Sequence, residues 1–171
     1  MSTRSNVVTM RGKPVTLLGP ELKAGDKAPD ATVVANDLSE VKLSSYRGKV
    51  LVLSAVPSLD TSVCSLETHK FNEHAAALGA DVAILTISMD LPFAQKRWCG
   101  AEGVDRVVTL SDYRYGQFGQ NYGVLIDGLR LLARALFVVD REGTIRHVQL
   151  VKEIATEPDY DAVLAAARQL K

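Results

Sequence analysis

The chain has 171 residues and no formal net charge, because 20 Lys and Arg residues balance 20 Asp and Glu residues. This length suits one domain with one substantial core, and we expect residues 1–171 to form a single domain. The balanced charge argues against nucleic acid or an anionic membrane as a partner, and no apolar run is long enough to cross a bilayer.

The first thirty residues predict a β-hairpin followed by a loop. Two short apolar runs, Val7–Met10 and Pro14–Leu18, are joined by Arg11-Gly12-Lys13, so the hairpin covers about residues 6–18. The N-terminal segment lacks the apolar stretch of a secretion signal, and we therefore expect a cytoplasmic protein. Turn-forming residues at 25–30 lead into an expected strand at 31–35.

The rest of the chain alternates between apolar runs and helical segments. In chain order we expect a strand at 50–56, a helix at 62–78, a strand at 82–88, a helix at 92–99, a strand at 107–110, a weakly helical segment at 113–122, strands at 133–139 and 144–151, and a helix at 158–170. Gly79 and Gly100 are expected to end the first two helices, and Asp90 is a plausible cap for the second. The order predicts an α/β protein with a mixed central sheet flanked by helices, compatible with a thioredoxin-like fold.

The segment Pro57-Ser58-Leu59-Asp60-Thr61-Ser62-Val63-Cys64 lies between a buried strand and a helix, where catalytic groups gather in parallel sheets. Asp60 or Thr61 can cap this helix through a side-chain oxygen, which places Cys64 in the first turn. The unpaired N–H groups and the positive end of the helix dipole favour a thiolate there.

The helix periodicity turns Cys64 inward, because it shares an arc with Phe71 and Leu78. His69 lies about 140° away around the helix and is poorly placed to serve as a base. A Cys–His protease pair is therefore disfavoured.

Cys64 and Cys99 are the two cysteines of the chain, and composition alone leaves their role open. They do not form a CxxC pair, and two sulfurs are too few for a zinc framework. They could be inert buried thiols, because free cysteine is among the most buried residue types. In a reducing cytoplasm, a disulfide between them would be transient and catalytic rather than structural.

The residue pattern Pro57-x-x-x-Thr61-x-x-Cys64 resembles the signature of the peroxiredoxin family. The segments Ser88–Ala94, Arg97-Trp98-Cys99 and Leu131–Ala135 resemble its thiol peroxidase branch, whose members use two cysteines of one chain. The likeness extends over nearly the whole sequence.

The resemblance implies a thiol-dependent peroxidase that reduces hydrogen peroxide and organic hydroperoxides. Cys64 would attack the peroxide and become a sulfenic acid, Thr61 would orient the peroxide, and Pro57 would shield the sulfur. Arg134 would stabilise the thiolate and the leaving oxygen, which agrees with its position in an otherwise buried strand. Alternatives remain open: Thr61 could only cap the helix, and Arg134 could only form a structural ion pair.

The resemblance also implies that Cys99 resolves the sulfenic acid as an intramolecular disulfide, which thioredoxin then reduces, and that the protein is a homodimer. Cys99 could instead be inert, with an outside thiol resolving Cys64. No cofactor or metal is expected. The competing functions are a thiol–disulfide exchange protein, which the missing CxxC disfavours, and a non-catalytic binding or chaperone module of the same fold.

Overall fold

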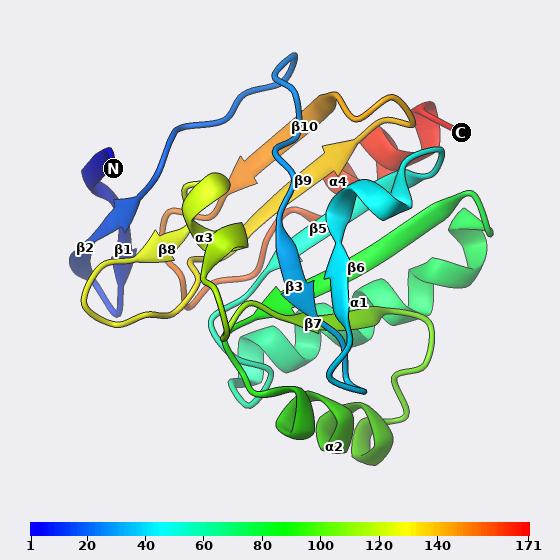
Figure 1. The fold of residues 1–171 in the computed structure, drawn as a ribbon, viewed down its shortest axis with the longest axis horizontal. Helices are drawn as coiled ribbons and strands as arrows, with labels where there is room; N and C mark the ends of the chain where they lie inside the picture. The colour runs from blue at the N-terminus through cyan, green and yellow to red at the C-terminus, as the bar shows by residue number, and fades with distance from the viewer.

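The computed structural model describes all residues from 1 to 171 and contains two β-sheets (Figure 1). The elements in chain order are β1 (Thr3–Met10), β2 (Lys13–Leu18), β3 (Thr32–Val34), β4 (Glu40–Lys42), the 3₁₀ helix η1 (Leu43–Tyr46), β5 (Val50–Ala55), α1 (Ser62–Leu78), β6 (Val82–Ser88), α2 (Pro92–Glu102), β7 (Val108–Ser111), α3 (Gln117–Asn121), β8 (Leu125–Ile126), β9 (Ala135–Val139), β10 (Ile145–Leu150) and α4 (Tyr160–Gln169).

The larger sheet has seven strands in the order β10-β9-β5-β6-β7-β3-β4. β5, β6 and β7 run parallel, while β9 pairs antiparallel with both β5 and β10. The two parallel connections pass through α1 and α2, as strand–helix–strand units require. The predicted α/β fold with a mixed central sheet is confirmed.

The sheet is covered on both faces, and all six residues of β5 are buried. One face packs against α1 and α4 in a cluster that includes Phe71, Leu78 and Val163. The opposite face packs against α3 and the smaller sheet, and its cluster includes Leu17 and Phe118. Figure 1 shows α1 and α4 behind the sheet, with α3 and β8 in front. None of the helices is both long enough and apolar enough to span a membrane.

The smaller sheet has the order β1-β2-β8 and contains the predicted N-terminal hairpin. The strands of the hairpin begin at Thr3, somewhat earlier than the sequence indicated. Backbone hydrogen bonds join Thr9 to Lys152 at 2.7 Å and to Ile154 at 2.9 Å. The tip of the hairpin is therefore docked against the segment that follows β10.

Two predictions about α2 were wrong. The helix does not stop at Cys99 but continues through Gly100 to Glu102, and it ends at Gly103 in the left-handed conformation with φ of 66°. A glycine can stay in a helix at a modest cost, so its position alone does not mark the end. The residue before the helix is Leu91, which makes no side-chain cap, and Asp90 contacts the loop before α1 instead.

Two short strands were not predicted. β4 spans three residues and β8 spans two, which is too short to produce a periodic pattern in the sequence. The weakly helical segment at 113–122 contains only the short helix α3.

Candidate active site

Cys64 is the third residue of α1, and its side chain is completely buried. The helix begins at Ser62, where the sequence predicts it, after a short loop that leaves the C-terminal end of β5. Cys64 thus lies at the edge of the sheet where parallel strands end and where the first turn of a helix presents unpaired N–H groups.

Arg134 contacts the sulfur of Cys64, and only 1% of this arginine is exposed. Its Nη2 donates a hydrogen bond to Cys64 Sγ at 3.2 Å, and its Nε donates to the carbonyl oxygen of Ile154 at 2.9 Å. Arg134 directly precedes β9, in which Ala135 pairs with Ala55 at the end of β5. The pairing of these two strands brings together residues that are 70 positions apart in the sequence.

Glu67 also belongs to this site, although it was not predicted from the sequence. Its Oε2 accepts a hydrogen bond from Arg134 Nη1 at 2.5 Å, and its Oε1 accepts one from the Ser54 hydroxyl at 2.8 Å. The signal was available, because Glu67 lies one helical turn after Cys64 and a buried arginine requires an anion.

Arg134 and Glu67 each favour the charged form of the other. Burial raises the pKa of Glu67, and the adjacent Arg134 guanidinium opposes that rise. Burial lowers the pKa of Arg134, but the charges of Glu67 and Cys64 outweigh this effect and leave it above its ordinary value. Arg134 therefore stays protonated and holds a positive charge at the sulfur of Cys64, where it favours a thiolate.

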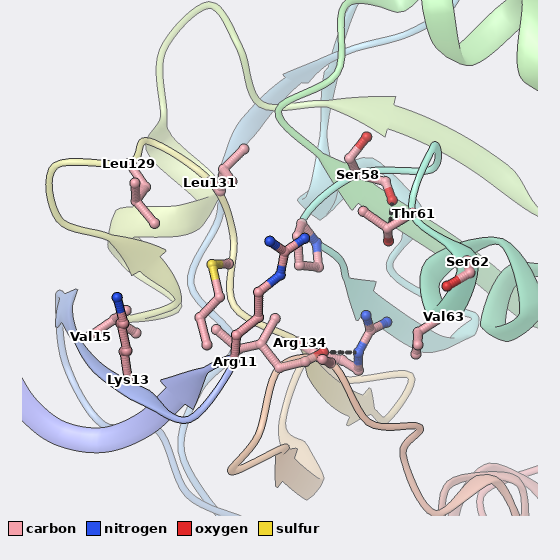
Figure 2. Close-up of a pocket in the computed structure, with 14 residues that line it drawn as sticks. Arg11, Lys13, Val15, Ser58, Thr61, Ser62, Val63, Leu129, Leu131 and Arg134 are labelled. Atoms are coloured by element: carbon pink, nitrogen blue, oxygen red, sulfur yellow. Dashed lines mark hydrogen bonds between the residues drawn. The ribbon is translucent and has the colours of Figure 1, made fainter.

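Thr61 precedes α1 but does not cap it through its side chain, contrary to one expectation from the sequence. Its hydroxyl instead donates to the carbonyl oxygen of Ser58 at 3.0 Å (Figure 2), which closes the loop on itself. Asp60, the other candidate cap, makes no side-chain cap either. Pro57 is buried, and Thr61 is exposed.

A cavity of about 550 Å³ opens beside Cys64. Three of the residues expected to form the site line it, namely Pro57, Thr61 and Arg134. Cys64 does not line the cavity itself and lies beneath these residues. A small ligand that enters the cavity therefore meets Arg134 before it reaches the sulfur.

Asp90 fixes the loop that carries Pro57 and Thr61. Its Oδ1 accepts from the Ser58 hydroxyl at 2.7 Å, while its Oδ2 accepts from the Leu59 amide at 2.8 Å and the Ser88 hydroxyl at 2.7 Å. The segment between β6 and α2 thereby holds the loop before α1 in place. From the sequence we expected Asp90 to cap α2. Capping a helix and accepting hydrogen bonds from a nearby loop are both ordinary functions of an aspartate before a helix, so the sequence did not distinguish them.

Cys99 is half-buried in α2 and is not joined to Cys64 by a disulfide. Its Sγ lies 3.5 Å from the hydroxyl of Thr109 on β7, and it lines a different cavity of about 400 Å³. The two cysteines that are expected to form the disulfide therefore do not share a cavity in the structure.

The two cysteine-bearing helices meet at a separate contact. His69 Nε2 of α1 lies 3.1 Å from Glu102 Oε2 of α2, and its ring packs against Trp98. His69 is thus engaged with α2, in agreement with the prediction that it does not serve Cys64. No group of three or more His, Cys, Asp or Glu side chains is arranged to hold a metal ion.

Residues 23–164 match the Redoxin family. A thiol peroxidase of Oceanobacillus iheyensis is 61% identical over 158 residues, which cover 92% of this chain and 96% of that protein. A thiol peroxidase of Bacillus subtilis is 52% identical over 163 residues, covering 95% and 97%. The crystal structure of a peroxiredoxin-like protein from Aquifex aeolicus superposes with a TM-score of 0.91 at 48% identity and covers 98% of both chains.

Proposed function

Since this chain belongs to the peroxiredoxin family and is a thiol-dependent peroxidase, we propose that Cys64 is the sulfur that attacks the peroxide. The observation that carries this assignment is the hydrogen bond from Arg134 Nη2 to Cys64 Sγ. A fixed cation at the sulfur favours the thiolate, which is the nucleophilic form of cysteine. Cys99 has the hydroxyl of Thr109 as its polar neighbour instead.

In the proposed first step, the Cys64 thiolate attacks one oxygen of the hydroperoxide and the O–O bond breaks. The sulfur becomes a sulfenic acid, and the other oxygen leaves as water or an alcohol after taking up a proton. Arg134 is placed to stabilise the charge that develops on the leaving oxygen, because it both lines the cavity and contacts the sulfur. Thr61 and Pro57 line the same cavity, which supports roles in orienting the peroxide and shielding the sulfur.

In the proposed second step, the Cys99 thiol attacks the sulfenic acid sulfur, which gives a Cys64–Cys99 disulfide and releases water. A dithiol such as thioredoxin then reduces the disulfide by thiol–disulfide exchange. The reduced cysteines have different neighbours and line no common cavity, which supports a rearrangement of one or both helix ends, in α1 and α2, before the disulfide forms.

We further propose that the protein works in the cytoplasm as a homodimer. A reducing compartment suits a disulfide that forms only during turnover. The cycle requires a hydroperoxide and a thiol reductant, and the proposed chemistry uses the two cysteines without a cofactor.

Two cysteine variants test this proposal by single-turnover consumption of hydrogen peroxide by the reduced protein. Cys64→Ser should consume none above the uncatalysed rate, because a hydroxyl is a far weaker nucleophile. Cys99→Ser should consume one equivalent of peroxide per chain and then stop, and a sulfenic-acid reagent should label Cys64. Full activity of Cys64→Ser would refute the assignment, whereas sustained turnover of Cys99→Ser with thioredoxin would refute only the role of Cys99.

A further inference from the structure

The tip of the N-terminal hairpin forms one wall of the cavity beside Cys64. Met10, Arg11, Lys13 and Val15 contribute to this wall, and they face the catalytic side formed by residues such as Thr61. Apolar side chains continue the lining through Leu129, Leu131 and Ile154. The cavity therefore combines an apolar lining with polar groups at two separate places, the catalytic side and the hairpin.

Arg11 and Lys13 place two positive charges in this wall with no acidic partner. Neither side chain forms an ion pair, and none of the residues that line the cavity is acidic. Figure 2 shows the Arg11 side chain extending between Leu131 and Ser58, while Lys13 lies beside Val15, across the cavity from Ser62. The third cation of the cavity, Arg134, is already engaged with Glu67 and Cys64.

Glu153 is the acidic residue next to the hairpin, and its oxygens are occupied by other donors. They accept hydrogen bonds from the Thr9 hydroxyl at 2.5 Å, the Arg11 amide at 2.9 Å and the Gly12 amide at 3.1 Å. Glu153 thus binds the backbone of the tip and leaves the Arg11 guanidinium without a hydrogen bond to it.

The backbone of the tip is held in a defined place beside the cavity. Arg11 and Gly12 have φ of 51° and 76°, the two positive values of a tight two-residue hairpin turn. The turn and the Glu153 anchor fix where these two exposed side chains leave the backbone, so both start from defined points at the cavity.

We propose that Arg11 and Lys13 bind the carboxylate of an organic hydroperoxide whose apolar body fills the cavity and whose peroxide group reaches Cys64. This assignment rests on the proposed function, and it specifies a substrate class within it. Hydroperoxides with an apolar body and a remote carboxylate are then reduced faster than neutral hydroperoxides of the same shape. Arg11 and Lys13 determine specificity and take no part in breaking the O–O bond.

The test compares linoleic acid hydroperoxide with its methyl ester, which differ in charge but present the same hydroperoxide. Both are used below the concentration at which they aggregate, and the second-order rate constant is measured in a single turnover of the reduced, full-length protein. The acid should react about fivefold faster than the ester at low ionic strength, as an exposed charge pair allows. This ratio should approach one in about 0.5 M NaCl, because salt screens exposed charges.

The double variant Arg11→Gln/Lys13→Gln should give a ratio near one already at low salt. The matched control is Arg168→Gln/Lys171→Gln, which removes the same charge from residues that do not line the cavity, and it should keep the preference of the unmodified protein. The salt series needs no variant, so the proposal stays testable even if the hairpin variant folds poorly.

Activity toward hydrogen peroxide distinguishes a failure of the carboxylate site from a failure of the proposed function. If the unmodified protein reduces hydrogen peroxide and both lipid hydroperoxides but shows no preference for the acid, the carboxylate site is wrong and the peroxidase assignment stands. If the Arg11→Gln/Lys13→Gln variant still reduces the acid faster than the ester, these residues are not the carboxylate site. If the unmodified protein reduces none of the three peroxides, the proposed function itself fails.

Discussion

Arg134 contacts two side chains in the core, and this makes its role hard to isolate by a single substitution. It pairs with Glu67 and donates to Cys64 Sγ, with both arginine and glutamate buried. Such a pair is weak evidence for stability, but removal of one partner leaves an uncompensated charge in the core. A loss of activity after Arg134 is replaced could therefore reflect either chemistry or folding.

A pair of variants separates the two effects. Arg134→Met should lower the free energy of unfolding by about 3–5 kcal/mol, because Glu67 is left buried without its cation. Glu67→Gln/Arg134→Met should recover most of that loss, yet single-turnover peroxide reduction should stay about 10²–10³-fold slow, since the positive charge at the sulfur is still missing. Urea denaturation and stopped-flow kinetics measure the two quantities.

The control for this pair is Arg114→Met. Arg114 forms its ion pair with Glu40 at 3.3 Å, and both side chains are partly exposed, at 35% and 49%, so its loss should change stability by less than about 1 kcal/mol and leave the reaction rate unchanged. If the Glu67→Gln/Arg134→Met variant has full activity, Arg134 is only structural and its contact with Cys64 does not contribute to catalysis.

One half-buried carboxylate helps to hold the N-terminal hairpin in its position over the site. Glu153 accepts hydrogen bonds from the Thr9 hydroxyl and the Arg11 and Gly12 amides, and it also accepts one from the Ala155 amide at 3.2 Å. The Thr9 hydroxyl and then the Gly12 amide lower the pKa of Glu153 most, to about 2. The charged form of Glu153 is thus the form that holds the hairpin.

The anchor should be lost in acid. Because the pKa of Glu153 is lower in the folded protein than its ordinary value of 4.5, its stabilising effect is complete above about pH 4.5 and fades as the pH falls toward 2. The melting temperature of Glu153→Gln should therefore lie below that of the unmodified protein at pH 7, and the two should converge between pH 4.5 and 2.

The matched control is Glu73→Gln on the exposed face of α1, a residue that forms no ion pair and no side-chain hydrogen bond. It should melt with the unmodified protein at every pH. A difference between Glu153→Gln and the unmodified protein that stays constant from pH 7 to pH 2 would mean that the charge of Glu153 does not anchor the hairpin.

The molecule as a whole must change shape during the catalytic cycle that we propose. Cys64 is buried at the start of α1, whereas Cys99 is half-buried in α2 and lies next to Thr109. Residues 100–102 at the end of α2 are exposed, and Glu102 there contacts His69 of α1, so we expect this end of the helix to open at least cost. The strands beneath remain as a fixed frame.

Hydrogen exchange on the reduced and the oxidised protein checks this view. Oxidation should reduce the protection of amides around Cys64 and Trp98, because we propose that one or both of these helix ends unwind when the sulfurs join. Amides in β6 and β9 should keep their protection, since these strands lie inside the seven-stranded sheet. Equal protection of α1 and α2 in the two states would contradict the rearrangement.

The sequence by itself determined the elements and the local chemistry of this protein. Apolar runs and glycine positions predicted β5, β6, α1 and the hairpin, since these signals act between residues that are close along the chain. The same local logic placed Cys64 in the first turn of a helix. Failures occurred where local signals were weak or ambiguous, as in β8, the end of α2 and Asp90.

Only the tertiary structure decided which distant side chains meet. The antiparallel register of β5 and β9 carries Arg134 to Cys64, and the fold of the hairpin carries Arg11 to the same cavity. Glu67 belongs to the site because the fold places Arg134 beside it, where the two side chains form a hydrogen bond. Such contacts depend on which strands pair and on which elements cover the faces of the sheet. The hydrophobic pattern of the sequence, which repeats every two to four residues, predicts neither of these.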